Sequence, residues 1–177
     1  MAPPPQTADQ TFEACASTAS LFLYAQGSVI LCLHHDTLAL ERRFENHQQD
    51  IAFISVDNVS ERGQGRLVVS YDIGQTAIVW DLFTGTEIAR FSSFQPLRVA
   101  AWMRDGNVAF GKAVLYILGY LRGRYPDNSI GDGKGDVILF EPSTSEHISS
   151  STLFDPITAL SPGADCRTYA IGYVCLF

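Results

Sequence analysis

Histidine, cysteine and acidic side chains supply most nucleophiles, general bases and metal ligands, so we consider them first. His34 and His35 are adjacent, and on a strand they point to opposite faces, so they cannot hold one ion together. None of the four cysteines forms a pair at the two-residue spacing of zinc and redox motifs. Residues 131–136 are glycine-rich but lack the Gly-Lys-Ser/Thr ending of a phosphate loop. The acidic residues are scattered singly, and the sequence therefore predicts no catalytic, metal or cofactor site.

The charge balance narrows the classes of partner. The 177 residues include 12 basic and 19 acidic ones, which gives a formal net charge of -7 and a pI near 4.9. An acidic surface disfavours nucleic acid and anionic membranes as partners. No apolar run outside the expected strands reaches the roughly 20 residues that a membrane-spanning helix needs. The N-terminus, MAPPPQTADQTFEA, lacks the basic and apolar segments of a signal peptide. We expect a cytoplasmic or nuclear protein, not secreted, with a disordered tail at 1–11.

The rest of the chain consists of short segments rich in Val, Ile, Phe and Tyr, separated by turn-forming residues, which is typical of strands. No stretch of helical periodicity and useful length precedes residue 112. The sequence predicts an all-β fold with strands at 20–26, 29–33, 38–44, 50–56, 66–71, 76–82, 86–91, 97–103, 107–111, 136–141, 157–162 and 168–173.

These segments repeat at a fixed spacing. The segments VVS and AFG end at Ser70 and Gly111, which are 41 residues apart, close to the roughly 40 to 45 residues of a propeller blade. The next equivalent, AIG, ends at Gly172, 61 residues later. Residues 112–133 match nothing in the other repeats, and removing these 22 residues leaves a spacing of 39. The segments that begin at Ile78 and Val137 give a similar result, so we expect a single insertion at 112–133.

One repeat resembles a known family. Residues 66–91, RLVVSYDIGQTAIVWDLFTGTEIARF, are similar to the second, third and fourth strands of a WD-repeat blade, with Trp80-Asp81 ending the third strand and Thr84-Gly85 in the turn. Weaker copies carry Leu31-Cys32 and Leu139-Phe140 in place of that dipeptide. The resemblance implies a partial β-propeller of about three to four blades of antiparallel meander sheets, not a closed ring. The expected blade-like units are 12–44, 50–91, 97–153 and 157–177.

The resemblance also implies a set of structural residues around Trp80. Its ring nitrogen needs a partner when the ring is buried, and in the family that set includes a histidine before the blade and an aspartate before the third strand. Here His47 and Asp72 are the candidates, although Gly74 occupies the usual aspartate position. His47 is either part of this network or an ordinary solvated loop histidine. Trp80, Asp81, His47, Asp72, Thr84 and Gly85 form the predicted structural motif.

WD-repeat propellers are rigid platforms that hold other proteins, so the resemblance implies a non-catalytic interaction scaffold whose partners are other proteins. The alternative is a fragment of a propeller enzyme of the quinone-dependent dehydrogenase type, which would need acidic metal ligands and a complete ring. With about four blades at most, the ring stays open and leaves sheet faces exposed. A partner, or self-association through the open blade faces, would cover them.

Two segments interrupt the repeat pattern. Residues 112–133 lie where the family has a tight turn, and residues 174–177 end the chain within a blade. Gly111-Lys112 and Val174-Cys175 can both be encoded by common intron-start sequences. One interpretation is that both segments are intron-derived and that the chain is a fragment or mis-spliced product of a longer propeller protein. The other is a genuine long loop, which propellers tolerate and which often carries function.

Overall fold

The computed structural model describes residues 14–60, 65–93, 96–112, 135–153, 157–162 and 169–173. Fourteen strands and no helix occur in this described part of the chain. The strands are β1 (Cys15–Ser17), β2 (Leu21–Gln26), β3 (Val29–His34), β4 (Leu40–Phe44), β5 (Ile51–Val56), β6 (Leu67–Asp72), β7 (Thr76–Asp81), β8 (Glu87–Ser92), β9 (Leu97–Trp102), β10 (Val108–Lys112), β11 (Gly135–Glu141), β12 (Glu146–Leu153), β13 (Ile157–Pro162) and β14 (Tyr169–Tyr173). The predicted all-β class is confirmed.

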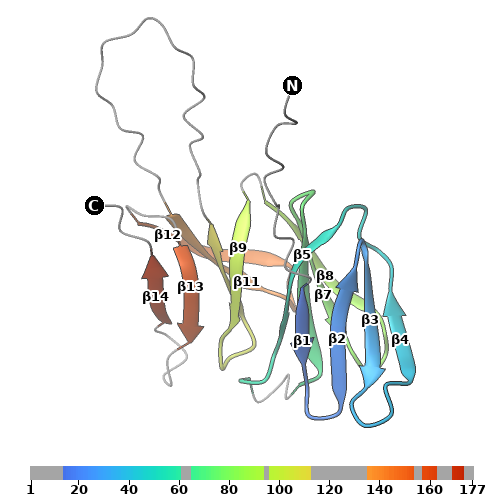
Figure 1. Ribbon diagram of the computed structural model, residues 1–177. Helices are drawn as coiled ribbons and strands as arrows, with labels where there is room; N and C mark the ends of the chain where they lie inside the picture. Colours follow the sequence, from blue (N-terminus) through green and yellow to red (C-terminus); the bar gives the residue numbers. More distant parts are fainter. Residues whose placement is uncertain are drawn as a thin grey trace, which may run out of the picture.

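The strands form four antiparallel sheets in which neighbours in sequence are neighbours in space. Sheet 1 is β1-β2-β3-β4, sheet 2 is β5-β6-β7-β8, sheet 3 is β9-β10-β11-β12 and sheet 4 is β13-β14. The four sheets overlap the ranges 12–44, 50–91, 97–153 and 157–177, and β8 ends at Ser92, one residue beyond the second range. Figure 1 shows them side by side in chain order, from sheet 1 in blue to sheet 4 in red, and no sheet closes on itself. The first strand of each sheet contacts the first strand of the next.

Strand alternation gives sheets 2 and 3 two apolar faces, as burial between two neighbours requires. On sheet 2, Val68, Ile78 and Trp80 face sheet 1 and share a core with its residues Leu23, Ile30, Cys32 and Phe44. Val69, Tyr71 and Val79 point the other way and share a second core with sheet 3. We call the side that packs on the preceding sheet the backward face, and the opposite side the forward face. A third core joins the forward face of sheet 3 to sheet 4.

The pairing register repeats from sheet to sheet, including its irregularities. The third and fourth strands lose register at Cys32/Leu33 in sheet 1, Val79/Trp80 in sheet 2 and Leu139/Phe140 in sheet 3. The first and second strands do so at Ile51/Phe53 in sheet 2, Gly111/Lys112 in sheet 3 and Ile157/Ala159 in sheet 4. A β-bulge is a specific structural feature of a strand pair and not a random defect. Their recurrence at matching positions makes the four sheets variants of one structural unit.

This register corrects three sequence alignments. Trp80 pairs with Val68, Phe140 with Val108 and Leu33 with Phe22, so Leu33 and Phe140 hold the position of Trp80. The expected equivalents, Leu31 in Leu31-Cys32 and Leu139 in Leu139-Phe140, are wrong by two residues and one residue. Likewise Phe110, and not Gly111, is equivalent to Ser70. Strands that are apolar at nearly every position carry no polar landmark, so sequence alone does not fix their alignment.

Strands β1 and β12 escaped prediction because one is very short and the other, EHISSSTL, is serine-rich. Lys112, expected to open the insertion, is the last residue of β10. The rest of the expected insertion, the expected tail at 1–11 and residues 174–177 lie outside the described residues. Within the part of the chain that the structure describes, no helix is long and apolar enough to cross a membrane.

Candidate functional site

A buried polar cluster lies around Trp80 in sheet 2. The Trp80 Nε1–H group donates to Ser70 Oγ at 2.8 Å, and Ser70 Oγ lies 2.7 Å from His47 Nε2. On the other side of the imidazole, His47 Nδ1 lies 2.9 Å from Asp72 Oδ2. Asp72 Oδ1 accepts from the backbone N–H of Thr76 at 2.9 Å, which closes the β6–β7 turn. All four side chains in this network are at most 3% exposed.

The donors and acceptors of this network determine which of its atoms carry hydrogen. A carboxylate only accepts, so His47 Nδ1 carries hydrogen and donates to Asp72. Burial lowers the pKa of His47 and so favours the neutral ring, and this effect outweighs the hydrogen bond to Asp72, which raises the pKa. The bare Nε2 then accepts from the Ser70 hydroxyl, whose oxygen accepts from Trp80. Every donor points from Trp80 towards Asp72, so all members of the network are satisfied.

The order Ser70, His47, Asp72 is also that of a nucleophile, its base and an orienting carboxylate. A serine nucleophile needs contact with a substrate, however, and Ser70 is 0% exposed. Its oxygen already receives the Trp80 N–H, where a reacting carbonyl would have to approach. The pocket described below includes none of these residues. The arrangement therefore ties the segment before β5 to β6 and β7, and it offers no reacting atom to solvent.

A second cluster organises the turn after β7. Asp81 Oδ1 accepts from the backbone N–H groups of Phe83 at 2.8 Å and Thr84 at 3.3 Å. Asp81 Oδ2 accepts from both Nε and Nη2 of Arg66, the former at 3.0 Å. The hydrogen bond from Arg66 is the main cause that lowers the pKa of Asp81 to about 2. Gly85 closes the turn with φ of +75° and donates its N–H to the Asp81 carbonyl at 2.8 Å.

The structure thus distributes the predicted residues over two clusters. Trp80, His47 and Asp72 share the buried network, whereas Asp81, Thr84 and Gly85 form the turn. Of the two readings of His47, the solvated loop histidine is excluded by its burial. Sequence reasoning missed Ser70, which links Trp80 to His47. The available signal was a lone serine within the apolar run LVVSYD of β6.

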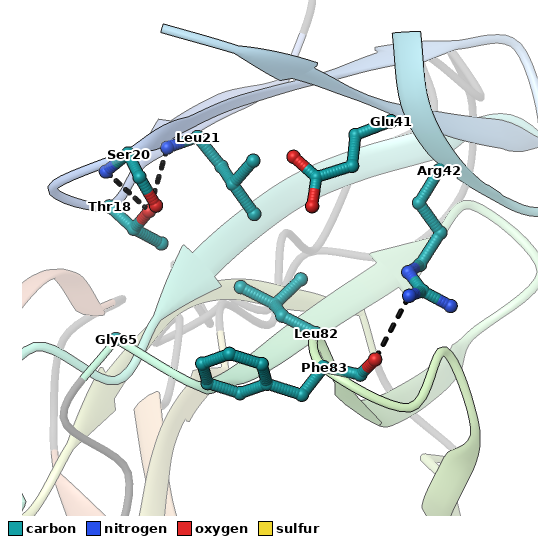
Figure 2. A pocket seen from close by; sticks show the side chains of 8 residues that line it. All are labelled: Thr18, Ser20, Leu21, Glu41, Arg42, Gly65, Leu82 and Phe83. Atoms are coloured by element: carbon teal, nitrogen blue, oxygen red, sulfur yellow. Dashed lines mark hydrogen bonds between the residues drawn. The ribbon is translucent and has the colours of Figure 1, made fainter.

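A small pocket opens beside this turn, between sheets 1 and 2. It has a volume of about 110 Å³, and its lining residues are Thr18, Ser20, Leu21, Glu41, Arg42, Gly65, Leu82 and Phe83. In Figure 2 the side chains of Leu21, Glu41 and Leu82 extend towards a shared space. Arg42 Nη2 donates to the Phe83 carbonyl at 2.9 Å and so fastens the pocket across the two sheets.

The pocket has both apolar lining residues, Leu21, Leu82 and Phe83, and charged ones, Glu41 and Arg42. Phe83 is 75% exposed, and its ring centroid lies 5.7 Å from Arg66 Cζ, within range of a cation–π contact. Pockets for drug-sized ligands and cofactors measure roughly 300 to 1,000 Å³. At about a third of the lower value, this one fits a single amino-acid side chain better than a cofactor. Among the described residues, no group of three or more His, Cys, Asp and Glu side chains is placed to hold a metal ion.

No protein-family model and no curated protein matches the chain. Its fold recurs among solved structures, of which 780 chains match. One is the crystal structure of the computationally designed Ika8 protein, with a TM-score of 0.63 and 17% sequence identity. The alignment covers 92% of this chain and 45% of the designed chain, so this protein spans less than half the length of the structure it matches. At this identity the likeness shows the fold alone.

Proposed function

We propose that the chain forms part of a WD-repeat β-propeller and acts as a non-catalytic scaffold that binds other proteins. The observation that carries the proposal is the four-stranded meander of sheets 1, 2 and 3, whose bulges return in the same register and whose sheets 2 and 3 bury both faces against their neighbours. A propeller stacks equivalent sheets in this way. The network around Trp80 and the turn through Thr84-Gly85 support the WD-repeat assignment.

The pocket supports the binding role. Its size suits one side chain of a protein partner, and the exposed Phe83 ring beside it offers the kind of rigid aromatic contact that is enriched at interfaces. The Arg42 bond to the Phe83 carbonyl and the Arg66 stacking hold this surface in place before a partner arrives, which lowers the entropic cost of binding.

The test compares proteins captured from a cell extract by immobilised wild-type chain and by two variants. Phe83→Asp charges the pocket border, whereas Ile73→Asp is the matched control, because Ile73 is 63% exposed but lies in the β6–β7 turn. We expect quantitative mass spectrometry to find a defined set of proteins that Phe83→Asp loses and Ile73→Asp retains. Capture of no specific protein, or equal capture by both variants, would contradict a binding role for this surface.

A further inference from the structure

One face of sheet 1 is only half-buried and, among the described residues, packs on no other sheet. Its backward face carries Phe22, Tyr24, Leu31 and Leu33, and the first two rings stack with centroids 6.0 Å apart. These four side chains are half-buried, and none belongs to the apolar cores of the described residues. The opposite face of the same sheet, with Leu23 and Ile30, packs on sheet 2.

Register shows what such a face packs against. The equivalents of Phe22, Leu31 and Leu33 are Val68, Ile78 and Trp80 in sheet 2, all buried against the forward face of sheet 1. In sheet 3 the equivalents are Val108, Ile138 and Phe140, buried against the forward face of sheet 2. Each described backward face after the first is therefore covered by the forward face of a preceding sheet. The backward face of sheet 1 has the same apolar pattern and calls for the same kind of surface.

In the part of the chain that the structure describes, the forward face of sheet 4 also packs on no other sheet. On sheet 4, Ala159, Ser161 and Ala170 are exposed. Their register equivalents on sheet 3 are Val99, Ala101 and Ala109, and Ala109 is fully buried in the core shared with sheet 4. The forward face of sheet 4 is thus equivalent to the forward face of sheet 3, which packs on sheet 4.

Two glycines make this correspondence closer. A Cβ atom on Gly111 would lie 2.7 Å from Ile157 Cγ2, so the absence of a side chain lets sheet 4 approach sheet 3. Gly172 holds the same register position in sheet 4, opposite Ala159 as Gly111 is opposite Val99. The forward face of sheet 4 therefore leaves space for another sheet at the same close distance.

We propose that the backward face of sheet 1 binds the forward face of sheet 4 of a second copy of this chain, and that two copies join head to tail in a ring of eight sheets. Both uncovered faces are then used, and eight sheets lie within the range of closed propellers. The designed protein of similar fold is more than twice as long as the portion that this chain matches. This inference rests on the propeller arrangement of the proposed function and adds a specific partner to it.

The experiment measures the oligomeric state by sedimentation velocity over a range of protein concentrations. We expect a dimer for wild type and for Ile73→Arg, whose substituted side chain lies in the β6–β7 turn. Leu31→Arg on sheet 1 and Ala170→Arg on sheet 4 should each raise the dimer dissociation constant about 100-fold or more, because each places an unpaired charge in the contact. Circular dichroism checks that both variants keep their β-sheet signal.

Mixing the two variants tests the head-to-tail geometry. Leu31→Arg retains an intact sheet 4 and Ala170→Arg an intact sheet 1, so together they keep one complete contact and should form a mixed dimer. A monomeric wild type, dimerisation unaffected by either variant, absence of the mixed dimer, or a ladder of larger oligomers would each overturn the proposal. So would dimerisation only after removal of residues 1–13. A monomer that still captures partners through Phe83 would refute the second copy and leave the proposed function standing.

Discussion

Replacing Ser70 by alanine should destabilise the protein far more than the loss of one hydroxyl group suggests. Ser70 Oγ is the acceptor for the Trp80 N–H group and the donor to His47 Nε2, and both partners are buried. Alanine removes both bonds at once, and in a packed core the space left by the hydroxyl group is too small for a water molecule to replace it. The variant therefore leaves one buried donor and one buried acceptor without a partner.

The magnitude follows from the cost of such groups. An unsatisfied buried polar group costs about 1 to 3 kcal/mol, so two cost about 2 to 6 kcal/mol in free energy of unfolding. Whole domains are stable by about 5 to 15 kcal/mol, so the effect is a large fraction of the total. Replacing Trp80 by phenylalanine first removes the donor. In that background Ser70→Ala orphans only His47, and its cost should fall by about 1 to 3 kcal/mol.

Urea denaturation followed by circular dichroism measures these differences, at one protein concentration because association shifts apparent stability. Ser92→Ala in the exposed part of β8 is the matched control and should stay within about 0.5 kcal/mol of wild type. Ser70→Thr keeps the hydroxyl and should recover most of the loss. A Ser70→Ala variant as stable as the Ser92→Ala control, or one equally costly with and without Trp80, would refute the network as an energetic unit.

Three further measurements address the same region. Trp80→Ala should cost about 3 to 5 kcal/mol by emptying a large buried site, and an unchanged urea midpoint would show that its burial contributes nothing. Because the pKa of His47 is lowered in the folded state, the unfolded chain binds more protons below about pH 6.5, so the urea midpoint should fall from pH 8 to pH 5; a flat profile would contradict this. Gly85→Ala puts a side chain at φ of +75°, a backbone conformation that favours glycine, and should cost about 1 to 3 kcal/mol in the same assay.

The sequence predicted the strands of this fold better than their alignment. Apolar segments bounded by turn residues identified twelve of the fourteen described strands, and the spacing between repeats separated the sheets. Strand alignment depends on which face each side chain occupies, and strands that are apolar on both faces leave a shift of one or two residues unmarked. The bulges at Cys32/Leu33 and Leu139/Phe140, which follow no sequence signal, contribute to the same uncertainty.

Prediction of the candidate site failed in a different way. Trp80, His47 and Asp72 were identified by residue type, but nothing in the spacing placed Ser70 between them, because the contact joins β6 to a segment 23 residues earlier. The pocket could not be predicted from the sequence. Its walls come from the turn before β2, from β4 and from the turn after β7, and only the packing of sheet 1 on sheet 2 brings these together.

Among the described residues the buried network has no counterpart in the neighbouring sheets, which is how one unit repeats without repeating its sequence. At the position of Ser70, sheets 1, 3 and 4 carry Tyr24, Phe110 and Ile171, and at that of Trp80 they carry Leu33 and Phe140. Phe110 and Ile171 need no hydrogen-bond partner, and Tyr24 is only half-buried, so the second position needs no indole N–H beside them. Either solution fills the space between sheets, because packing requires matching volume and register but not particular residues. Burial between neighbouring sheets therefore accounts for the shared bulges and the alternation of faces, whereas the polar network, within the part of the chain that the structure describes, belongs to sheet 2.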